Sequence, residues 1–168
     1  MTDQIGPQTP CGVNHLVLNV RDIEASHRFW VGLLGFRQVG VSRRSAPGRP
    51  PMRFYSGERN GQLHHHDIAL VEASFAGEAA ASKQALNHVA IEYSTEEAWQ
   101  EQIRYLLSCG VPLSDRIDRG VSKSIHLTDP NGYIVELVYE LPRELWEGDI
   151  DAALNRGTRR PIVEEDGV

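Results

Sequence analysis

Two histidines and one glutamate stand out as the residues of this chain that could carry chemistry. His15 and His88 each follow an asparagine in similar apolar segments, Val-Asn-His-Leu-Val-Leu and Leu-Asn-His-Val-Ala-Ile. Glu136 lies in the apolar segment Tyr-Ile-Val-Glu-Leu-Val, directly after the turn sequence Asp-Pro-Asn-Gly. A carboxylate in an apolar strand needs a positive partner, either an Arg, Lys or His side chain or a metal ion.

The spacing of these residues favours a metal ion as that partner. A lone histidine in a strand is usually structural, but His15 and His88 occupy equivalent places in a sequence repeat. Together with Glu136 they form a set of two histidines and one carboxylate, which leaves neighbouring coordination positions open and is typical of non-haem Fe(II), with Mn(II) as a substitute. We therefore expect His15, His88 and Glu136 to be the metal ligands.

The repeat also predicts how the chain is organised. Asn14-His15 recurs as Asn87-His88, and Asn60-Gly61 recurs as Asn131-Gly132, at nearly the same spacing. Each repeat reads as strand, helix and three strands, so we expect paired modules that face one another across a cavity. The predicted boundaries are a flexible lead-in at 1–12, module one at 13–72, a linker at 73–85, module two at 86–140, and a C-terminal helical turn with a loose tail at 141–168.

Helix caps and turn residues mark the predicted elements. Asp22 is expected to cap a first helix that Gly35 ends, and Ser94 or Thr95 a second helix that Gly110 ends. The sequence from Ser122 to Val138 predicts a β-hairpin. In its second strand Val135 and Leu137 should face one way and Glu136 the other, because strand side chains alternate.

Composition limits the classes of function. The chain has 168 residues, a net charge of −6 and a pI near 5.6, which argues against a nucleic-acid-binding protein. Its two cysteines form no disulfide framework and fit a reducing cytoplasm. The sequence has no apolar stretch of membrane-spanning length, so we expect a cytoplasmic protein that binds no membrane. Trp146 and Leu154 are candidate contacts for a homodimer.

Several motifs resemble the vicinal oxygen chelate superfamily, which includes glyoxalases, bleomycin-resistance proteins and extradiol dioxygenases. The similar segments are the two Asn-His strands, the helix end Phe-Trp-Val-Gly-Leu-Leu-Gly-Phe, and Asp-Pro-Asn-Gly-Tyr-Ile-Val-Glu-Leu. The resemblance spans about Val13 to Glu140. It implies an α+β fold in which paired βαβββ modules form one domain, a half-open barrel around a metal site.

Within this superfamily the chain most resembles single-domain extradiol catechol dioxygenases. That resemblance implies that Fe(II) binds a small aromatic diol and O2, and that the ring opens beside the diol. His66 matches the acid/base histidine of those enzymes. His126 stands where they usually have a substrate-binding tyrosine, which makes it a second candidate catalytic residue, and Arg119 stands where many have a histidine.

Two alternatives remain open at this level. Aligning Asn60-Gly61 with Asn131-Gly132 places His65, instead of His66, opposite Glu136, and strand alternation would put His65 and His66 on different faces. With His65 as a fourth ligand, the chain would be a non-oxidative isomerase, epimerase or lyase that stabilises an enediolate on a divalent metal. A non-catalytic ligand-binding protein on the same fold is the other alternative.

Overall fold

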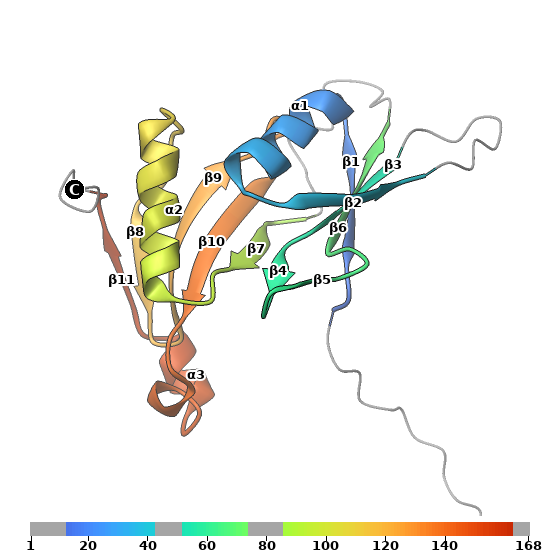
Figure 1. Ribbon diagram of the computed structural model, residues 1–168. Coiled ribbons are helices and arrows are strands. Elements are labelled where there is room, and N and C mark those ends of the chain that lie inside the picture. Colours follow the sequence, from blue (N-terminus) through green and yellow to red (C-terminus); the bar gives the residue numbers. More distant parts are fainter. Residues whose placement is uncertain (1–12, 43–51, 74–85, 163–168) are drawn as a thin grey trace, which may run out of the picture. The chain divides into compact units, whose positions relative to one another are not determined.

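The computed structural model of the chain describes residues 13–42, 52–73 and 86–162 (Figure 1). The predicted lead-in and nearly all of the predicted linker lie outside these ranges. The described chain divides into two compact units. One contains 13–20 and the described part of 36–73, and the other contains 21–35 and 86–162. The first predicted helix therefore groups with the second unit, whereas the sequence repeat placed it in module one.

The first unit is built on a four-stranded sheet with the order β1-β6-β3-β2. Strand β1 runs parallel to β6, and the other pairs are antiparallel. Leu18, Tyr55 and Leu70 are buried in its core. A separate hairpin joins β3 to β6. The strands of this unit are β1 (Leu16–Val20), β2 (Arg37–Val41), β3 (Met52–Ser56), β4 (Glu58–Arg59), β5 (Gln62–Leu63) and β6 (Ile68–Glu72).

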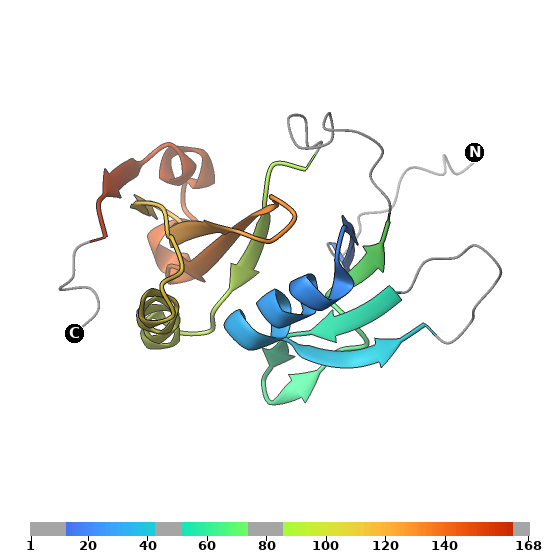
Figure 2. The ribbon, with the colours of Figure 1, turned by 90° about the horizontal axis from the view of Figure 1, so that it is seen from above.

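The second unit is built on a five-stranded sheet with the order β11-β8-β9-β10-β7. Strand β10 runs parallel to β7 and antiparallel to β9. Helix α2 covers one face of this sheet, and Figure 2 shows the helix end on beside the strands. The elements of this sheet and its helix are β7 (Val89–Glu92), α2 (Glu96–Ser108), β8 (Arg116–Arg119), β9 (Ser122–Thr128), β10 (Ile134–Glu140) and β11 (Gly157–Arg160).

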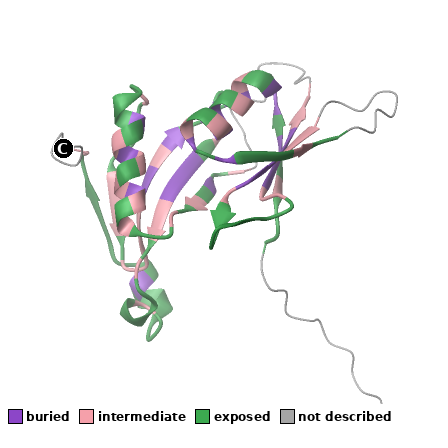
Figure 3. Cartoon of the chain, viewed as in Figure 1, coloured by how far each residue is buried: buried purple, intermediate pink, exposed green. Residues whose placement is uncertain are grey.

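The two faces of this sheet differ in polarity, as strand alternation predicts. Val135 and Leu137 are fully buried on the face toward α2, where the Trp99 indole Nε1 donates a 3.0 Å hydrogen bond to the Leu137 carbonyl. Buried positions are concentrated on β9 and β10 (Figure 3). Glu136 and Val138 point to the opposite face. The sheet therefore has one apolar face and one face that carries ionisable side chains.

The predicted helix signals are confirmed. The Asp22 side chain accepts hydrogen bonds from the backbone N–H groups of Glu24 and Ala25, which caps α1 (Ile23–His27). The helix continues as a π-helical segment, η1 (Arg28–Leu33), and Gly35 follows with a φ of 75°. Thr95 caps α2. In both repeats a strand and a helix are thus followed by three strands of the main sheet, with the β4–β5 hairpin in addition in the first repeat, and the α+β class is confirmed. In the described ranges no helix is long and apolar enough to cross a membrane.

The end of the chain differs from the prediction. The sequence was expected to be loose from Thr158, but β11 pairs with β8 in antiparallel register. Its polar residues hide this pairing, because they show none of the apolar alternation that identifies a strand. Two short helices precede it, η3 (Arg143–Leu145) and α3 (Ile150–Leu154).

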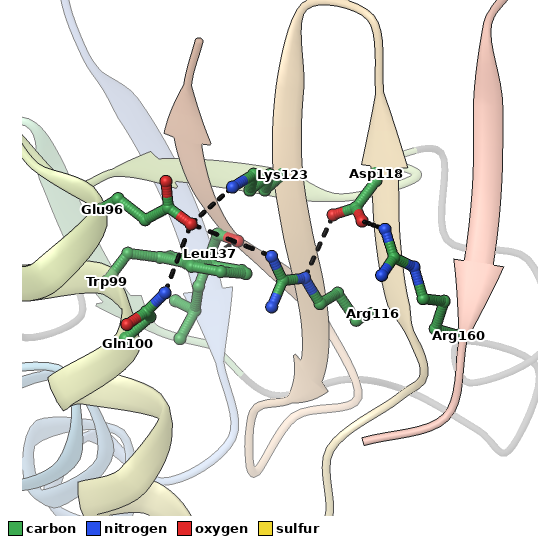
Figure 4. A network of polar contacts seen from close by, with 8 residues as sticks. All are labelled: Glu96, Trp99, Gln100, Arg116, Asp118, Lys123, Leu137 and Arg160. Carbon is green, nitrogen blue, oxygen red and sulfur yellow. Dashed lines mark hydrogen bonds and ion pairs between the residues drawn. The ribbon is translucent and has the colours of Figure 1, made fainter. Parts of the chain in front are cut away.

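Charged side chains hold α2 and β11 to the sheet on the helix side (Figure 4). Glu96 of α2 pairs with Lys123 of β9. The guanidinium of Arg116 lies 5.0 Å from the centroid of the Trp99 ring. Asp118 accepts from Arg116 Nε at 3.1 Å and from Arg160 Nη2 at 2.7 Å. Carboxylates therefore compensate part of the positive charge of the β8–β11 pair on this face.

The two Asn-Gly turns have different structures. Asn60 and Gly61 both have positive φ, at 54° and 74°, and Asn60 is exposed. Asn131 is 7% exposed and is absent from the residues with positive φ. Its side chain instead accepts a hydrogen bond from Arg21 N and donates to Ser26 Oγ and Asp129 Oδ2. Asn131 thus joins the β9–β10 turn to the first helix.

This difference predicts opposite responses to the same substitution. Asn131→Gly should lower the free energy of unfolding by about 2–3 kcal/mol, because it removes three side-chain hydrogen bonds in a buried place. Asn60→Gly should change it by less than about 0.5 kcal/mol, because glycine adopts positive φ freely. Urea unfolding of both variants measures the difference, and equal losses would contradict the bridging role of Asn131.

Candidate metal and acid/base site

Three predicted site residues meet on the open face of the sheet in the second unit. His88 directly precedes β7, His126 lies on β9 and Glu136 on β10. The antiparallel register places Glu136 opposite His126, and the parallel register places it beside Ala90. Since His88 and Ala90 are two residues apart, all three ionisable side chains point to the same face.

Glu136 is the centre of this group. The residue is 8% exposed, which is rare for a carboxylate. Its Oε2 lies 3.2 Å from His88 Nε2, and its Oε1 lies 3.6 Å from His126 Nε2. The two imidazole rings are nearly perpendicular, with centroids 5.9 Å apart. The side chains that face Glu136 in the structure are thus two histidines.

The neighbouring asparagine orients the ring of His88. Asn87 Oδ1 lies 2.7 Å from His88 Nδ1. An amide oxygen only accepts hydrogen bonds, so Nδ1 carries the proton and the lone pair of a neutral ring is on Nε2. That lone pair faces Glu136 Oε2. Two acceptor atoms at 3.2 Å repel one another unless a positive charge lies between them, either a proton or a metal ion.

The donor set fits a divalent metal. Imidazole nitrogen and carboxylate oxygen are both ligands of Mn(II), Fe(II) and Zn(II). A separation of 3.2 Å is close to that of two atoms that bind one ion at about 2.1 Å in neighbouring positions. A carboxamide hydrogen bond to the far nitrogen is a usual support for a metal-binding histidine. His88 and Glu136 therefore have the geometry of two ligands of one metal.

The first unit repeats the arrangement of asparagine and histidine. His15 directly precedes β1, as His88 precedes β7, and Asn14 Oδ1 lies 2.7 Å from His15 Nδ1. Nε2 is again the free nitrogen. The sequence repeat of Asn-His is thus a repeat of side-chain geometry, although sequence reasoning had used the asparagines only as markers of the repeat.

His15 contacts two further histidines in the first unit. The centroid of its ring lies 4.3 Å from that of His66 and 6.1 Å from that of His65. His65 Nδ1 and His66 Nδ1 are 2.8 Å apart, and the Phe54 ring lies 5.1 Å from His66. Burial lowers the pKa of His66, and the charges of His15 and His65 act in the same direction.

The prediction that His65 and His66 lie on different faces of a strand is wrong. Residues 64–67 form a bend before β6, so strand alternation does not apply to them. Both rings lie near His15. The repeat register is also different from the prediction: β1 pairs Val17 with Ala69, whereas β7 pairs Ala90 with Glu136. The counterpart of Glu136 in the first unit is therefore the buried Ala69, and neither His65 nor His66.

His126 is a neutral imidazole beside the carboxylate. Burial is the main cause that lowers its pKa. The charges of His88, Arg119 and Arg159 act in the same direction, and Glu136 opposes them. Its backbone N–H donates to Ser114 Oγ at 2.9 Å, which fixes the strand at this point. A neutral ring at this position can accept a proton at neutral pH.

The predicted set of ligands is only partly brought together. His88, Glu136 and His126 meet in the second unit, while His15, His65 and His66 meet in the first. In the part of the chain that the structure describes, no group of three or more His, Cys, Asp or Glu side chains is arranged to hold a metal ion. The second unit supplies two of the three predicted ligands, and the first supplies the histidine in the equivalent place.

Comparison with known proteins gives the family. The model of the Glyoxalase/Bleomycin resistance protein/Dioxygenase superfamily matches residues 12–137. The chain belongs to this superfamily. A search of curated proteins found no match. The predicted superfamily is thus confirmed, and the site lies within the matched residues.

Solved structures of this superfamily share the fold at low identity. A glyoxylase/bleomycin resistance protein/dioxygenase domain from Frankia sp. EAN1pec has a TM-score of 0.62 and 16% identity, over 79% of this chain and 100% of that one. The fosfomycin resistance protein FosX from Listeria monocytogenes, complexed with Mn(II) and sulfate ion, has a TM-score of 0.56 and 18% identity, over 81% and 98%. Lactoylglutathione lyase from Agrobacterium tumefaciens has a TM-score of 0.53 and 17% identity, over 79% and 96%.

The orientation of His88 by Asn87 can be tested by metal affinity. Asn87→Ala should weaken Mn(II) binding about tenfold, because the ring then loses its fixed tautomer and direction. Asn155→Ala, in the same unit, should leave the affinity unchanged. Calorimetric titration measures both, and 15N NMR of the imidazoles should show that His88 loses its Nδ1–H preference only in Asn87→Ala. An unchanged affinity in Asn87→Ala would refute the assignment.

Proposed function

We propose that this chain is a divalent-metal-dependent enzyme of the non-oxidative kind, an isomerase, epimerase or lyase that moves a proton on a small oxygen-bearing substrate. The observation that carries this proposal is the His88–Glu136 pair, with His126 on the other side of the same carboxylate. It supplies metal ligands and an acid/base group together on one open face of a sheet.

His15 completes the proposed set of ligands. It lies in the other unit, so its assignment rests on the repeat and on its shared geometry with His88, and not on a distance. In both histidines the preceding asparagine holds Nδ1 at 2.7 Å and leaves Nε2 free. Mn(II) in the FosX structure supports a metal of this class.

The chemistry divides between the metal and the protein. A divalent metal supplies Lewis acidity, which stabilises negative charge that develops on a substrate oxygen. Glu136 lies between the two histidines and would hold the metal together with His88. The neutral His126 ring has a lone pair on Nε2 or Nδ1, according to its tautomer. With this nitrogen it accepts a proton from the substrate, and it returns the proton at another atom. Because Glu136 faces the His126 ring, it stabilises the imidazolium that forms during the transfer.

Two kinds of support favour a non-oxidative reaction over ring cleavage by O2. FosX and lactoylglutathione lyase are among the similar solved structures, and their names do not describe dioxygenases. The chain also has His126 and Arg119 where the resemblance to extradiol dioxygenases implies a tyrosine and a histidine. The first of these is the position of the substrate-binding tyrosine.

Extradiol cleavage is the second candidate, and His66 is the observation that favours it. The centroid of its ring lies 4.3 Å from that of His15, with the two rings tilted by 48°, and burial lowers the pKa of His66. A neutral histidine beside a proposed metal ligand is what the dioxygenase resemblance implies for the acid/base group. Fe(II) would be the metal in that case.

Substitution of the ligands tests the metal site. His15→Ala, His88→Ala and Glu136→Ala should each abolish stoichiometric Mn(II) binding, because each removes a ligand of the proposed set. His64→Ala, an exposed histidine of the first unit, is the matched control and should bind Mn(II) as the unmodified chain does. Elemental analysis after dialysis gives the occupancy, and full occupancy in Glu136→Ala would exclude the proposed ligands.

The type of reaction is tested by two assays on one protein preparation, purified anaerobically and loaded with Mn(II) or Fe(II). The non-oxidative proposal expects exchange of a substrate C–H for deuterium in D2O, seen by proton NMR with a panel of α-hydroxycarbonyl compounds. It also expects no O2 uptake with catechols. Consumption of one O2 per catechol, with a yellow product, would replace the proposal by the dioxygenase candidate.

A further inference from the structure

The paired strands β8 and β11 carry four arginines, and the arginines on the two faces of the pair have different partners. Arg116 and Arg160 are opposite one another on the face toward α2. Both bind Asp118, which lies between them (Figure 4). A carboxylate of the protein therefore compensates part of the positive charge on this face.

Arg119 and Arg159 lie on the opposite face. The register pairs Arg159 with Ile117 and Arg119 with Gly157, and alternation then places both arginines on the side away from Asp118. This is the face that carries Glu136 and His126, since Ile117 is opposite Ser124 and Ser124 is two residues from His126. Both arginines are exposed, and across residues 13–42, 52–73 and 86–162 neither forms an ion pair.

The two guanidinium groups can reach one common ligand. Arg119 and Arg159 are diagonal neighbours across the strand pair, and such Cβ atoms are roughly 7–8 Å apart, within reach of long side chains. Gly157 stands opposite Arg119, and a Cβ built on Gly157 would meet nothing within 4 Å. The space beside Arg119 is therefore open.

The position of β11 is fixed by packing. A Cβ at Gly120 would lie 2.5 Å from the carbonyl oxygen of Ala153, so only glycine allows this approach of α3 to the β8–β9 turn. The Gly120 N–H donates to the Arg156 carbonyl at 3.1 Å. Arg159 follows three residues later and is thus held in place beside Arg119.

We propose that Arg119 and Arg159 form an anion subsite on the face of the sheet that carries His126, and that the substrate of the proposed enzyme carries an oxyanion group, a carboxylate or a phosphate-type group. Two like charges side by side repel one another unless an anion lies between them, and guanidinium groups bind such oxygens in bidentate fashion. The strand register agrees with this placement, since Arg159 is opposite Ile117 and Ile117 is opposite Ser124, on the face of His126. The inference rests on the proposed function, because it names the class of substrate for the same site.

The test uses the full chain without metal and inorganic phosphate as the probe. Titration followed by the Nε–Hε signals of the arginines should show saturable binding. Arg119→Gln and Arg159→Gln should each weaken it about tenfold, which corresponds to the loss of one charge-assisted hydrogen bond. Arg160→Gln removes the same charge from the other face of the same strand pair and should leave phosphate affinity unchanged. Equal weakening in Arg160→Gln, or no saturable binding, would overturn the proposal.

A second arm uses acetate. Displacement of phosphate by acetate at similar concentration would identify a carboxylate subsite, and its failure to compete would identify a phosphate-type subsite. Mn(II) affinity measured on the Arg119→Gln and Arg159→Gln variants should equal that of the unmodified chain. Mn(II) binding without phosphate binding would refute the anion subsite alone. Phosphate binding by a chain that binds no metal would refute the proposed enzyme and indicate an anion-binding protein.

Discussion

The buried carboxylate of Glu136 is the constraint on which the second unit depends. Removing a carboxylate from water costs several kcal/mol unless positive or donating groups replace the water. The rings of His88 and His126 face Glu136 at 3.2 and 3.6 Å, and a proton or a metal ion between His88 and Glu136 would supply the positive charge. This requires the β7–β10–β9 order and its register, because a slip of one residue would turn Glu136 into the apolar face against Trp99.

The repeat is symmetric in its histidines and asymmetric in its acid. Asn14-His15 and Asn87-His88 have the same geometry before equivalent strands, but Ala69 occupies the place that Glu136 occupies in the second unit. Of the two units, only the second therefore has a carboxylate at this position of the repeat. An acid at the position of Ala69, which is fully buried, would need a positive partner of its own.

Local patterns of the sequence predicted the elements, and longer-range contacts explain what it missed. Alternation identified the face of Glu136, and Asp22 and Thr95 identified the helix starts. The bend at 64–67 was not predicted, because its histidines directly precede strand β6. Strand β11 was not predicted, because its register is set by Asp118 and Gly120 instead of by apolar residues. In the sequence Asn131 looked like a turn residue only. Its contact with Ser26 spans most of the chain, so no local pattern could show it.

Charge is distributed on the second sheet in a way that its overall composition conceals. The chain has a net charge of −6, yet the β8–β11 pair has four arginines and one acid, Asp118, which binds the two arginines toward α2. Asp118 thus holds β11, a strand that follows the family-matched residues 12–137. The opposite face of the sheet carries Arg119 and Arg159 together with His126. The strand added at the end of the chain therefore acts on the same face as the proposed acid/base group.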